Sequence, residues 1–450
     1  MKVNKLTCKN LYGFVNKTIE FKEKINLLVG INGSGKTSIL NILHWLTKPS
    51  LPDLAVTEFL ELTLDFTFKN EEYKLKATQD EVEIRLFLTN LTTNHEFDSI
   101  QATFHIHPSK ISKNENLKAE FREQYVGLGP EKHEVATWSF IYDTLPMPIV
   151  IGLDRFLKDK NESENKRNRR GIPEKTNPLS NVKEIANREY SIYRSRMLTL
   201  NSDLNEKIMM ASFNKVYKQD QLNELIAKPM ISKKQLTDLE TKITKYFEES
   251  VFTKKNRSKK EEDSIQIIKD YFNELKDILT EEIKVEKPLV YLMNISQIAN
   301  INLLMDEFKI FEKRSKIFYD RINAYLTTLN SFFKDSAKEI IFKKDISELR
   351  FNILDKNGKI IEQNRDIETL SSGEKQILTL FTYLSFNTHN GNLFIIDEPE
   401  LSLHPKWQED FLPNVEKLMP ANAQLLIATH SPVIVGKKKE YCTVLLPYNT

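Results

Sequence analysis

Residues 30–37, GINGSGKT, fit the pattern G-x-x-x-x-G-K-[ST] of a loop that holds nucleotide phosphates. An apolar run typical of a strand, INLLV, precedes the loop, and a run typical of a helix, SILNILHWL, follows it. This context favours a phosphate loop over a glycine-rich turn with a chance lysine. In such a loop, glycines let successive N–H groups face the phosphates at a helix N-terminus.

The motif predicts the ligands of ATP and Mg²⁺. Lys36 should reach the β- and γ-phosphates, and the Thr37 hydroxyl should bind Mg²⁺. The full set of predicted nucleotide-binding residues is Gly30, Asn32, Gly33, Ser34, Gly35, Lys36, Thr37 and Ser38.

Two later apolar runs end in residues suited to phosphate chemistry. In LFIIDEPELSLHP, we expect Asp397 to hold Mg²⁺ through water and Glu398 to deprotonate the attacking water. In LIATHSP, His430 leaves a second buried run and can touch the γ-phosphate. Alone, such an acidic pair can be a solvated loop and such a histidine can be structural. Downstream of a phosphate loop, the catalytic interpretation is favoured.

The segment LSSGEKQILTL, residues 370–380, predicts another helix N-terminus able to face an anion. Its simplest interpretation is a helix capped by Ser371 or Ser372. One ATP site does not need two phosphate-binding helix ends. We therefore expect two copies of the chain to pair head to tail, with this helix of one copy closing the nucleotide of the other.

The order of phosphate loop, LSSGEKQ, DEPE and ATHSP resembles the ABC-type ATPase head, in the branch containing SMC, RecF and OLD-family proteins. The resemblance covers the two ends of the chain, roughly residues 1–150 and 335–450. It implies a homodimer that sandwiches ATP, with higher homo-oligomers expected.

The same resemblance implies roles for individual residues. Ser371, Ser372 and Gly373 would act in trans, Glu398 would be the catalytic base and His430 the switch histidine. Ser372 departs from the family pattern, because it stands where the signature usually has its first glycine. Two candidates for stacking on adenine remain, Tyr12 and Phe14, and core packing is favoured for Phe14.

The first part of the chain has the alternation typical of half-buried antiparallel strands. In FLELTLDFTF the apolar residues from Leu60 to Phe68 point one way, and EVEIRLFL repeats this pattern from Val82 to Leu88. MPIVIGLDR predicts a short buried strand that ends near Asp154.

The middle of the chain predicts helices. No glycine lies between Gly171 and Gly358, and glycine is costly in helix interiors. SIQIIKDYFNELKDILTEEI, residues 264–283, has apolar residues at three- and four-residue steps, as an amphipathic helix does. Similar periodicity occurs in residues 181–200 and 302–329, and breaks are expected near Pro229 and Pro288.

After Gly358, NLFIID and QLLIATH are typical of buried parallel strands, and PKWQEDFLPNVEKLM predicts a crossover helix that begins at Pro405. The predicted fold is an α/β ABC-ATPase head, a mixed sheet with an N-terminal antiparallel part. A short, coiled-coil-like helical lobe is inserted into it. The predicted domains are 1–155, 156–335 and 336–450.

Composition limits the function classes. Forty per cent apolar and 28% charged residues fit a core-forming protein, and a net charge of +2 gives no global nucleic-acid signature. The basic segments KRNRRG and KKNRSKK are read first as solvated linkers, with phosphate-backbone contact as the alternative. No apolar run approaches a membrane span, and the N-terminus lacks the apolar region of a signal peptide. With only Cys8 and Cys442, we expect a cytoplasmic protein.

The resemblance also suggests a role. The inserted lobe is much shorter than an SMC coiled coil, and the chain stops about twenty residues after His430, without room for the TOPRIM nuclease domain of OLD proteins. This arrangement resembles the ATPase subunits of bacterial antiphage systems such as Septu and PARIS. It implies a sensor and scaffold ATPase that controls a separate effector, an HNH or TOPRIM nuclease, in response to a phage protein or altered nucleic acid.

Two alternatives stay open. A RecF-like repair or recombination ATPase would bind DNA ends or junctions in a salt-sensitive manner strengthened by ATP. An ATP-gated structural protein would turn over little. Because Glu398 is present, we expect hydrolysis, although slow.

Overall fold

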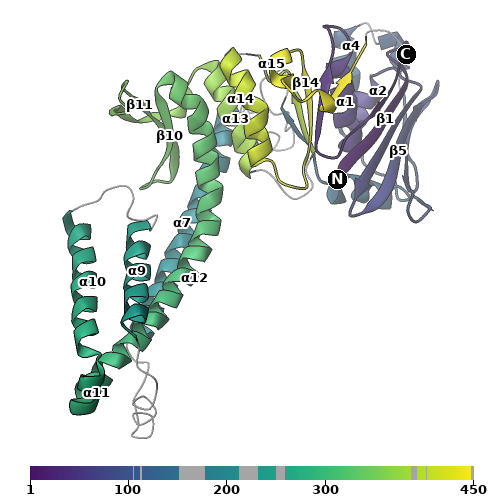
Figure 1. Ribbon diagram of the computed structural model, residues 1–450. Coiled ribbons are helices and arrows are strands. Elements are labelled where there is room, and N and C mark those ends of the chain that lie inside the picture. The colour runs from purple at the N-terminus through teal and green to yellow at the C-terminus, as the bar shows by residue number, and fades with distance from the viewer. Residues whose placement is uncertain are drawn as a thin grey trace, which may run out of the picture. The chain divides into compact units, whose positions relative to one another are not determined.

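The computed structural model describes residues 1–104, 106–111, 114–151, 178–211, 232–249, 259–386, 393–401 and 403–446. The chain forms two compact units. The first comprises Met1–Ser191 and Ile322–Thr450, and the second comprises Ile192–Arg321. Figure 1 shows that the first unit carries the strands, whereas the second is built from helices.

An antiparallel sheet in the first unit has the order β2-β1-β4-β5-β6-β7, with β8 also paired to β6. Its strands are β1 (Lys2–Leu11), β2 (Val15–Glu20), β4 (Glu61–Phe68), β5 (Glu71–Gln79), β6 (Glu83–Asn90), β7 (His95–Glu96) and β8 (Ile100–Thr103). The predicted antiparallel part is therefore confirmed. The prediction that Leu60 and Val82 point inward is wrong. These side chains are 57% and 62% exposed, because each residue precedes its strand.

A parallel sheet has the order β15-β3-β14-β13-β9. Its strands are β3 (Ile25–Val29), β9 (Ile149–Ile151), β13 (Leu393–Asp397), β14 (Gln424–Thr429) and β15 (Cys442–Val444). The buried parallel strands predicted in NLFIID and QLLIATH are confirmed. The strand predicted in MPIVIGLDR is β9, and Asp154 lies outside the described residues.

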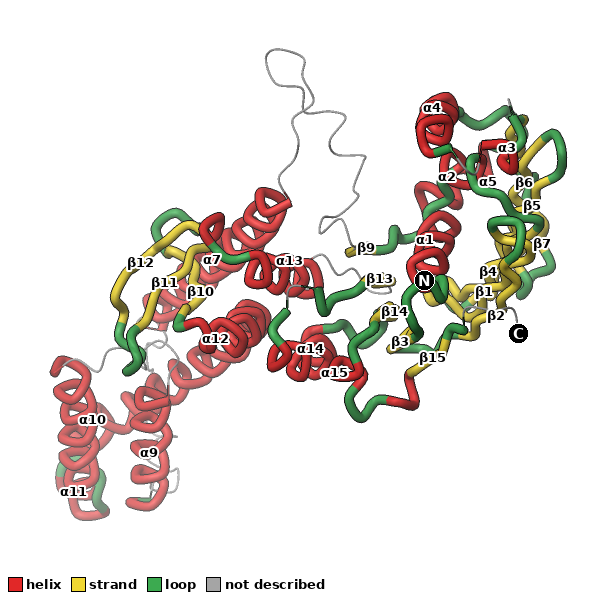
Figure 2. The backbone as a smooth tube through the Cα atoms, turned by 90° about the horizontal axis from the view of Figure 1, so that it is seen from above, coloured by secondary structure: helices red, strands yellow, loops and turns green. Residues whose placement is uncertain are grey.

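The register of this sheet aligns the ends of three strands. Val29 is opposite Thr429, and Asp397 is opposite Ala428. The strands β3, β14 and β13 lie side by side and are parallel (Figure 2). The residues that follow them therefore emerge at one edge of the sheet.

The first unit also contains helices that pack on its sheets, and a third sheet, which is antiparallel. The helices are α1 (Lys36–Thr47), α2 (Leu51–Ala55), α3 (Pro108–Ile111), α4 (Glu115–Val126), α5 (Val135–Ser139), η1 (Phe140–Thr144), η2 (Lys334–Ser336), η3 (Ile367–Thr369), α13 (Ser372–Phe386), α14 (Pro405–Leu418), α15 (Pro432–Val435) and η4 (Lys439–Tyr441). The third sheet is β10 (Lys338–Lys343), β11 (Glu348–Leu354) and β12 (Ile360–Asp366). The predicted start of the crossover helix at Pro405 is confirmed.

The predicted helical middle is also present. It consists of α7 (Pro178–Ala211), α9 (Lys233–Glu249), α10 (Lys259–Ile278), α11 (Glu281–Glu286) and α12 (Pro288–Phe333). The single helix predicted over 264–283 is wrong, because the Thr280 hydroxyl caps α11 by accepting a hydrogen bond from the Ile283 N–H at 3.4 Å. The break at Pro288 is confirmed. Pro229, KRNRRG and most of KKNRSKK lie outside the described residues.

The predicted domain limits of 1–155, 156–335 and 336–450 remain predictions. Both α7 and α12 continue from one compact unit into the other. None of the helices in the described ranges combines the length and apolar character needed to cross a bilayer.

A buried glutamine links the antiparallel and parallel sheets. Gln424 opens β14 and is fully buried. Its Oε1 accepts from the Val3 N–H at 2.7 Å, and its Nε2 donates to the carbonyls of Val3 and Lys22 at 2.8 Å each. Three main-chain groups thus depend on one side chain.

We predict that Gln424→Met lowers the free energy of unfolding by about 2–4 kcal/mol, because the three backbone groups lose their partner while the volume is kept. Denaturant unfolding followed by circular dichroism measures the change. The control Gln101→Met removes only an exposed contact to Ser99, so a change within about 0.5 kcal/mol is expected. Equal effects of the two substitutions would contradict the role given to Gln424.

Candidate functional site

The predicted phosphate loop connects β3 to α1 in the structure. Gly33 and Gly35 have φ angles of 81° and 88°, in the left-handed region that favours glycine. Gly30 is required for a different reason: a Cβ there would lie 2.5 Å from the Leu445 carbonyl and 2.6 Å from the Ser34 hydroxyl. Glycine is therefore favoured by backbone conformation at positions 33 and 35 and by lack of space at position 30.

Lys36 is held inside this loop. Its side chain is buried, and Nζ donates to the carbonyls of Gly30 at 3.0 Å and Ile31 at 3.1 Å. Burial lowers the pKa of Lys36, and the nearby carboxylates, with Glu398 the strongest, oppose that shift. The ammonium therefore lies beside weak neutral acceptors, which a phosphate oxygen can replace.

Asp397 and Glu398 lie at the end of β13, beside the loop. Asp397 is 9% exposed, and burial raises its pKa, an effect that a hydrogen bond from Thr37 partly offsets. Glu398 has a φ of 46°, in the left-handed region that a non-glycine residue adopts only at a cost. Its N–H donates to the Ala428 carbonyl at 2.8 Å, which holds this conformation.

His430 joins the lysine to the glutamate. Its Nδ1 lies 3.3 Å from Lys36 Nζ, and its Nε2 lies 3.2 Å from Glu398 Oε1. An ammonium can only donate, so Nδ1 accepts and Nε2 carries the proton that faces the carboxylate. The structure thus brings three of the predicted residues, which are far apart in the sequence, into one polar chain.

Glu400 was not predicted as a site residue, yet it fixes His430. Its Oε1 accepts from the His430 N–H at 2.6 Å, and its Oε2 accepts from the Thr429 hydroxyl at 2.9 Å. Ser431, which follows His430, caps α15 and donates to Gln408 Oε1 at 2.7 Å. The only sequence signal for Glu400 was its place as the last residue of DEPE.

The remaining loop residues have different environments. Asn32 is exposed, and the Ser34 hydroxyl is buried without a hydrogen-bond partner in the described part of the chain. Ser38 hydrogen-bonds the hydroxyl of Tyr12, whose pKa is raised by burial. The core packing favoured for Phe14 is wrong, because this side chain is 64% exposed beside a turn.

Ser371 caps α13, as one of the two predicted options. Its Oγ accepts from the Glu374 N–H at 3.4 Å, and the Glu374 carboxylate accepts from the Ser371 N–H at 2.8 Å. Lys338 donates to both Glu374 oxygens at 2.8 Å. Burial raises the pKa of Glu374, but the hydrogen bonds from Lys338 and Ser371 outweigh it, so the pKa lies below its usual value.

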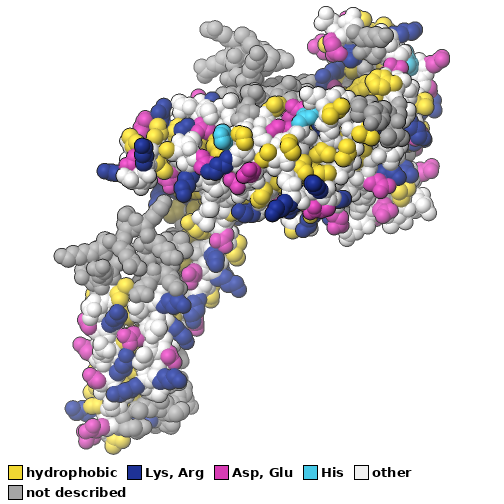
Figure 3. All heavy atoms as spheres, turned by 45° about the horizontal axis from the view of Figure 1, so that its top comes forward, with side chains coloured by type: hydrophobic (Ala, Val, Ile, Leu, Met, Phe, Trp, Pro, Cys, Tyr) yellow, Lys and Arg dark blue, Asp and Glu magenta, His cyan; other side chains and the backbone are white. Residues whose placement is uncertain are grey.

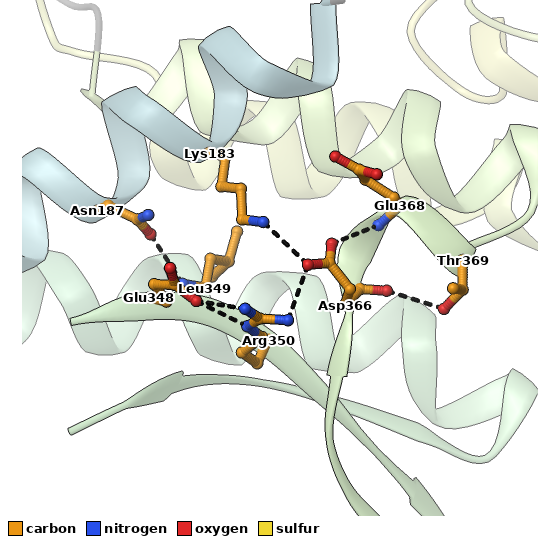
Figure 4. A network of polar contacts seen from close by, with 8 residues as sticks. All are labelled: Lys183, Asn187, Glu348, Leu349, Arg350, Asp366, Glu368 and Thr369. Atoms are coloured by element: carbon orange, nitrogen blue, oxygen red, sulfur yellow. Dashed lines mark hydrogen bonds and ion pairs between the residues drawn. The ribbon is translucent and has the colours of Figure 1, made fainter. Parts of the chain in front are cut away.

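A polar network fixes the segment just before this helix (Figure 4). The Asp366 carboxylate accepts from Lys183 of α7 at 2.9 Å, from Arg350 of β11 at 2.7 Å and from the Glu368 N–H at 3.0 Å. Figure 4 shows these groups converging on Asp366 from three elements. Three hydrogen bonds therefore hold Asp366 in place just before the segment that carries Ser371.

The signature residues are separate from the phosphate loop within one chain. Ser371 and Ser372 are exposed, whereas Gly373 is buried. Among the described residues, no hydrogen bond joins any of the three to residues 30–38. One chain therefore presents the phosphate loop and the signature without connecting them.

The residues present fit a nucleotide with Mg²⁺. The buried Ser34 hydroxyl, the Lys36 ammonium on backbone carbonyls and the Thr37 hydroxyl beside Asp397 all offer replaceable or unused polar groups. Within the described ranges, no group of three or more His, Cys, Asp or Glu residues could hold a metal. A hydroxyl and a carboxylate, as at Thr37 and Asp397, are oxygen ligands of the kind that Mg²⁺ binds together with waters and substrate phosphates.

Comparison with family models identifies the chain. The model of the AAA ATPase domain matches residues 1–435. The chain belongs to this AAA ATPase family. Membership in an ATPase family confirms the coarse functional prediction made from the phosphate loop.

Curated relatives of this AAA ATPase include two retron proteins. The "Retron Ec83 probable ATPase" of Escherichia coli is 30% identical over 162 residues, which cover 30% of this chain and 29% of that protein. The "Retron Vc95 probable ATPase" of Vibrio cholerae is 28% identical over 145 residues, or 28% and 27% of the two chains. The chain thus matches less than a third of the length of either relative.

A solved structure is also similar along most of the chain. It is the Smc head domain with an extended coiled coil, bound to the C-terminal domain of ScpA, from Pyrococcus furiosus. The aligned region covers 96% of this chain and 91% of the Smc chain, with 12% sequence identity and a TM-score of 0.38. The α/β architecture is given by the strands and helices of this AAA ATPase itself.

We predict that Asp397→Asn raises the thermal midpoint of the nucleotide-free protein at pH 7 by roughly 2–4 °C. The folded-state pKa of Asp397 is raised by burial, so its ionised form opposes folding above that pKa. The gain should shrink as the pH falls through the folded-state pKa and Asp397 becomes protonated. Scanning calorimetry measures both effects.

The control for this substitution is Asp345→Asn, at an exposed turn between β10 and β11, where no change in midpoint is expected. A lower midpoint for Asp397→Asn than for the parent would show that the carboxylate stabilises the fold, contrary to this reading.

Proposed function

We propose that this protein binds ATP with Mg²⁺ at the edge of the parallel sheet and hydrolyses it slowly to ADP and phosphate. The observation that carries the proposal is the chain of contacts from Lys36 through His430 to Glu398, beside Asp397. A phosphate-binding lysine, a carboxylate placed for the metal and a second carboxylate placed for water are the parts that phosphoryl transfer needs.

Each residue has a distinct task in this proposal. Lys36 leaves the carbonyls of Gly30 and Ile31 and binds the β- and γ-phosphates. Glu398 accepts the proton of the attacking water, and His430 orients Glu398 through Nε2. Mg²⁺ bound near Thr37 and Asp397 would neutralise charge on the phosphates.

We also propose that the site is completed by a second copy of the chain. Ser371 and Ser372 at the start of α13 are exposed and offer their hydroxyls to an anion at a helix N-terminus, whereas the Ser371 N–H is already held by the Glu374 carboxylate. Because no described contact links them to the loop of their own chain, a head-to-tail homodimer gives them a ligand. Gly373 would allow close approach to the partner's nucleotide.

We predict that Glu398→Gln binds ATP but hydrolyses it at least about 100-fold more slowly, because the amide cannot accept the proton of water. The ATP-bound dimer should accumulate, as measured by phosphate release and by light scattering coupled to gel filtration. Lys36→Ala serves as the control and should lose nucleotide binding. Unchanged turnover by Glu398→Gln would refute the assignment of the base, and no turnover by the parent would refute the proposed activity.

For the biological role, we propose a sensor and scaffold ATPase of antiphage defence that controls a separate effector protein. The similarity to proteins named as retron ATPases supports this class. The effector is expected to be an HNH or TOPRIM nuclease, and the trigger a phage protein or altered nucleic acid. A RecF-like ATPase that acts on DNA ends or junctions is the alternative. On the face drawn in Figure 3, Lys and Arg side chains are interspersed with Asp and Glu.

We predict that the product of the neighbouring open reading frame co-purifies with this protein when the two are co-expressed, and that ATP changes the yield. The matched control is Lys36→Ala, in which the ATP effect should vanish. A lone dimer with ATP-strengthened, salt-sensitive binding of DNA ends in a filter assay would instead support the RecF-like alternative.

A further inference from the structure

A small cavity lies between α13 and the end of β13. Gln376, Thr379, Ile396, Asp397 and Pro399 contribute to its lining. Its volume of about 20 Å³ is sufficient for one water molecule. The cavity therefore separates the helix that begins at the signature from the strand that carries the proposed metal-binding carboxylate.

Two buried acceptors of this cavity lack partners. Within the described part of the chain, neither Gln376 Oε1 nor Asp397 Oδ1 has a hydrogen-bond donor. Buried polar groups in folded proteins are almost always satisfied, so two such atoms on one cavity indicate a missing donor.

The orientation of the Gln376 amide is fixed by a neighbour. Its Nε2 donates to the Pro399 carbonyl at 3.3 Å. Reversing the amide would place two oxygens against each other at Pro399. The oxygen of Gln376, a lining residue of the cavity, is therefore the amide atom that no side chain in the described ranges satisfies.

We infer that an ordered water fills this cavity and donates one hydrogen bond to Gln376 Oε1 and one to Asp397 Oδ1. A water has two protons to donate, which matches the two unsatisfied acceptors. Gln376 is then a positioning residue: through the water it holds the Asp397 carboxylate in the orientation that binds Mg²⁺. This inference rests on the proposed function.

The water between Gln376 and Asp397 would also connect two nucleotide sites. Gln376 lies on the same helix as the capping residue Ser371, which we propose to contact the nucleotide of a second copy. The region of α13 thus carries Ser371 for the nucleotide site of the second copy and Gln376 for the nucleotide site of its own chain. Movement of α13 on dimerisation would be transmitted to Asp397 through a single water.

The test compares Gln376→Met with Thr379→Val. The first keeps the volume but removes the acceptor, and the second alters the same cavity one turn further along α13. Binding of a fluorescent ATP analogue is measured in EDTA and across a Mg²⁺ titration, together with thermal unfolding. These readouts do not depend on turnover.

We expect Gln376→Met to bind the analogue in EDTA as the parent does, but to need about 10-fold more Mg²⁺ for half-maximal enhancement of binding. Thr379→Val should shift that midpoint less than about twofold. If Gln376→Met unfolds, Gln376→Asn, whose shorter stem withdraws the oxygen from the cavity, should shift the midpoint in the same direction.

An unchanged midpoint for the Gln376 variant that folds, or equal shifts for Gln376→Met and Thr379→Val, would overturn the inference. Failure of the parent to bind the analogue at any Mg²⁺ concentration is a distinct result, because it would overturn the proposed function as well.

Discussion

The register of three parallel strands is the constraint on which the candidate site depends. Because Val29 pairs with Thr429 and Asp397 pairs with Ala428, the phosphate loop, His430 and Glu398 leave the sheet at one edge. A slip of one residue in β14 would reverse the side-chain directions of that strand and move its end relative to both neighbours. The buried Gln424 at the start of β14 ties this register to the antiparallel sheet.

Several residues of the candidate site adopt conformations or environments that lower the stability of the folded chain. Glu398 adopts a left-handed φ of 46°, Asp397 is ionisable yet buried, and Lys36 is buried beside neutral carbonyls. Each of these features opposes the stability of the nucleotide-free chain. Each also leaves a charge or an unsatisfied group directed at the place where we propose that phosphates and Mg²⁺ bind, which explains why they occur together.

The sequence predicted strands of the antiparallel and parallel sheets, because apolar runs are local signals, but it did not predict the sheet formed by β10, β11 and β12. The roles of the site residues remain predictions. The sequence did not predict Glu400, Gln424 or the Glu374–Lys338 pair, since their partners lie in other elements and leave no spacing pattern. The helix break at Thr280 was also missed, because the apolar periodicity continues through the cap. Exposure of Phe14 depended on a turn that periodicity does not describe.

The central claim is that one ATP site is built from two copies of the chain. It is tested most directly by mixing Lys36→Ala with Ser371→Arg, each inactive alone, and measuring ATP hydrolysis. A shared site predicts recovery of up to roughly a quarter of the parent activity, because a mixed dimer keeps one site with an intact loop and an intact signature. No recovery in a mixture whose mixed dimers are shown to form would contradict the claim.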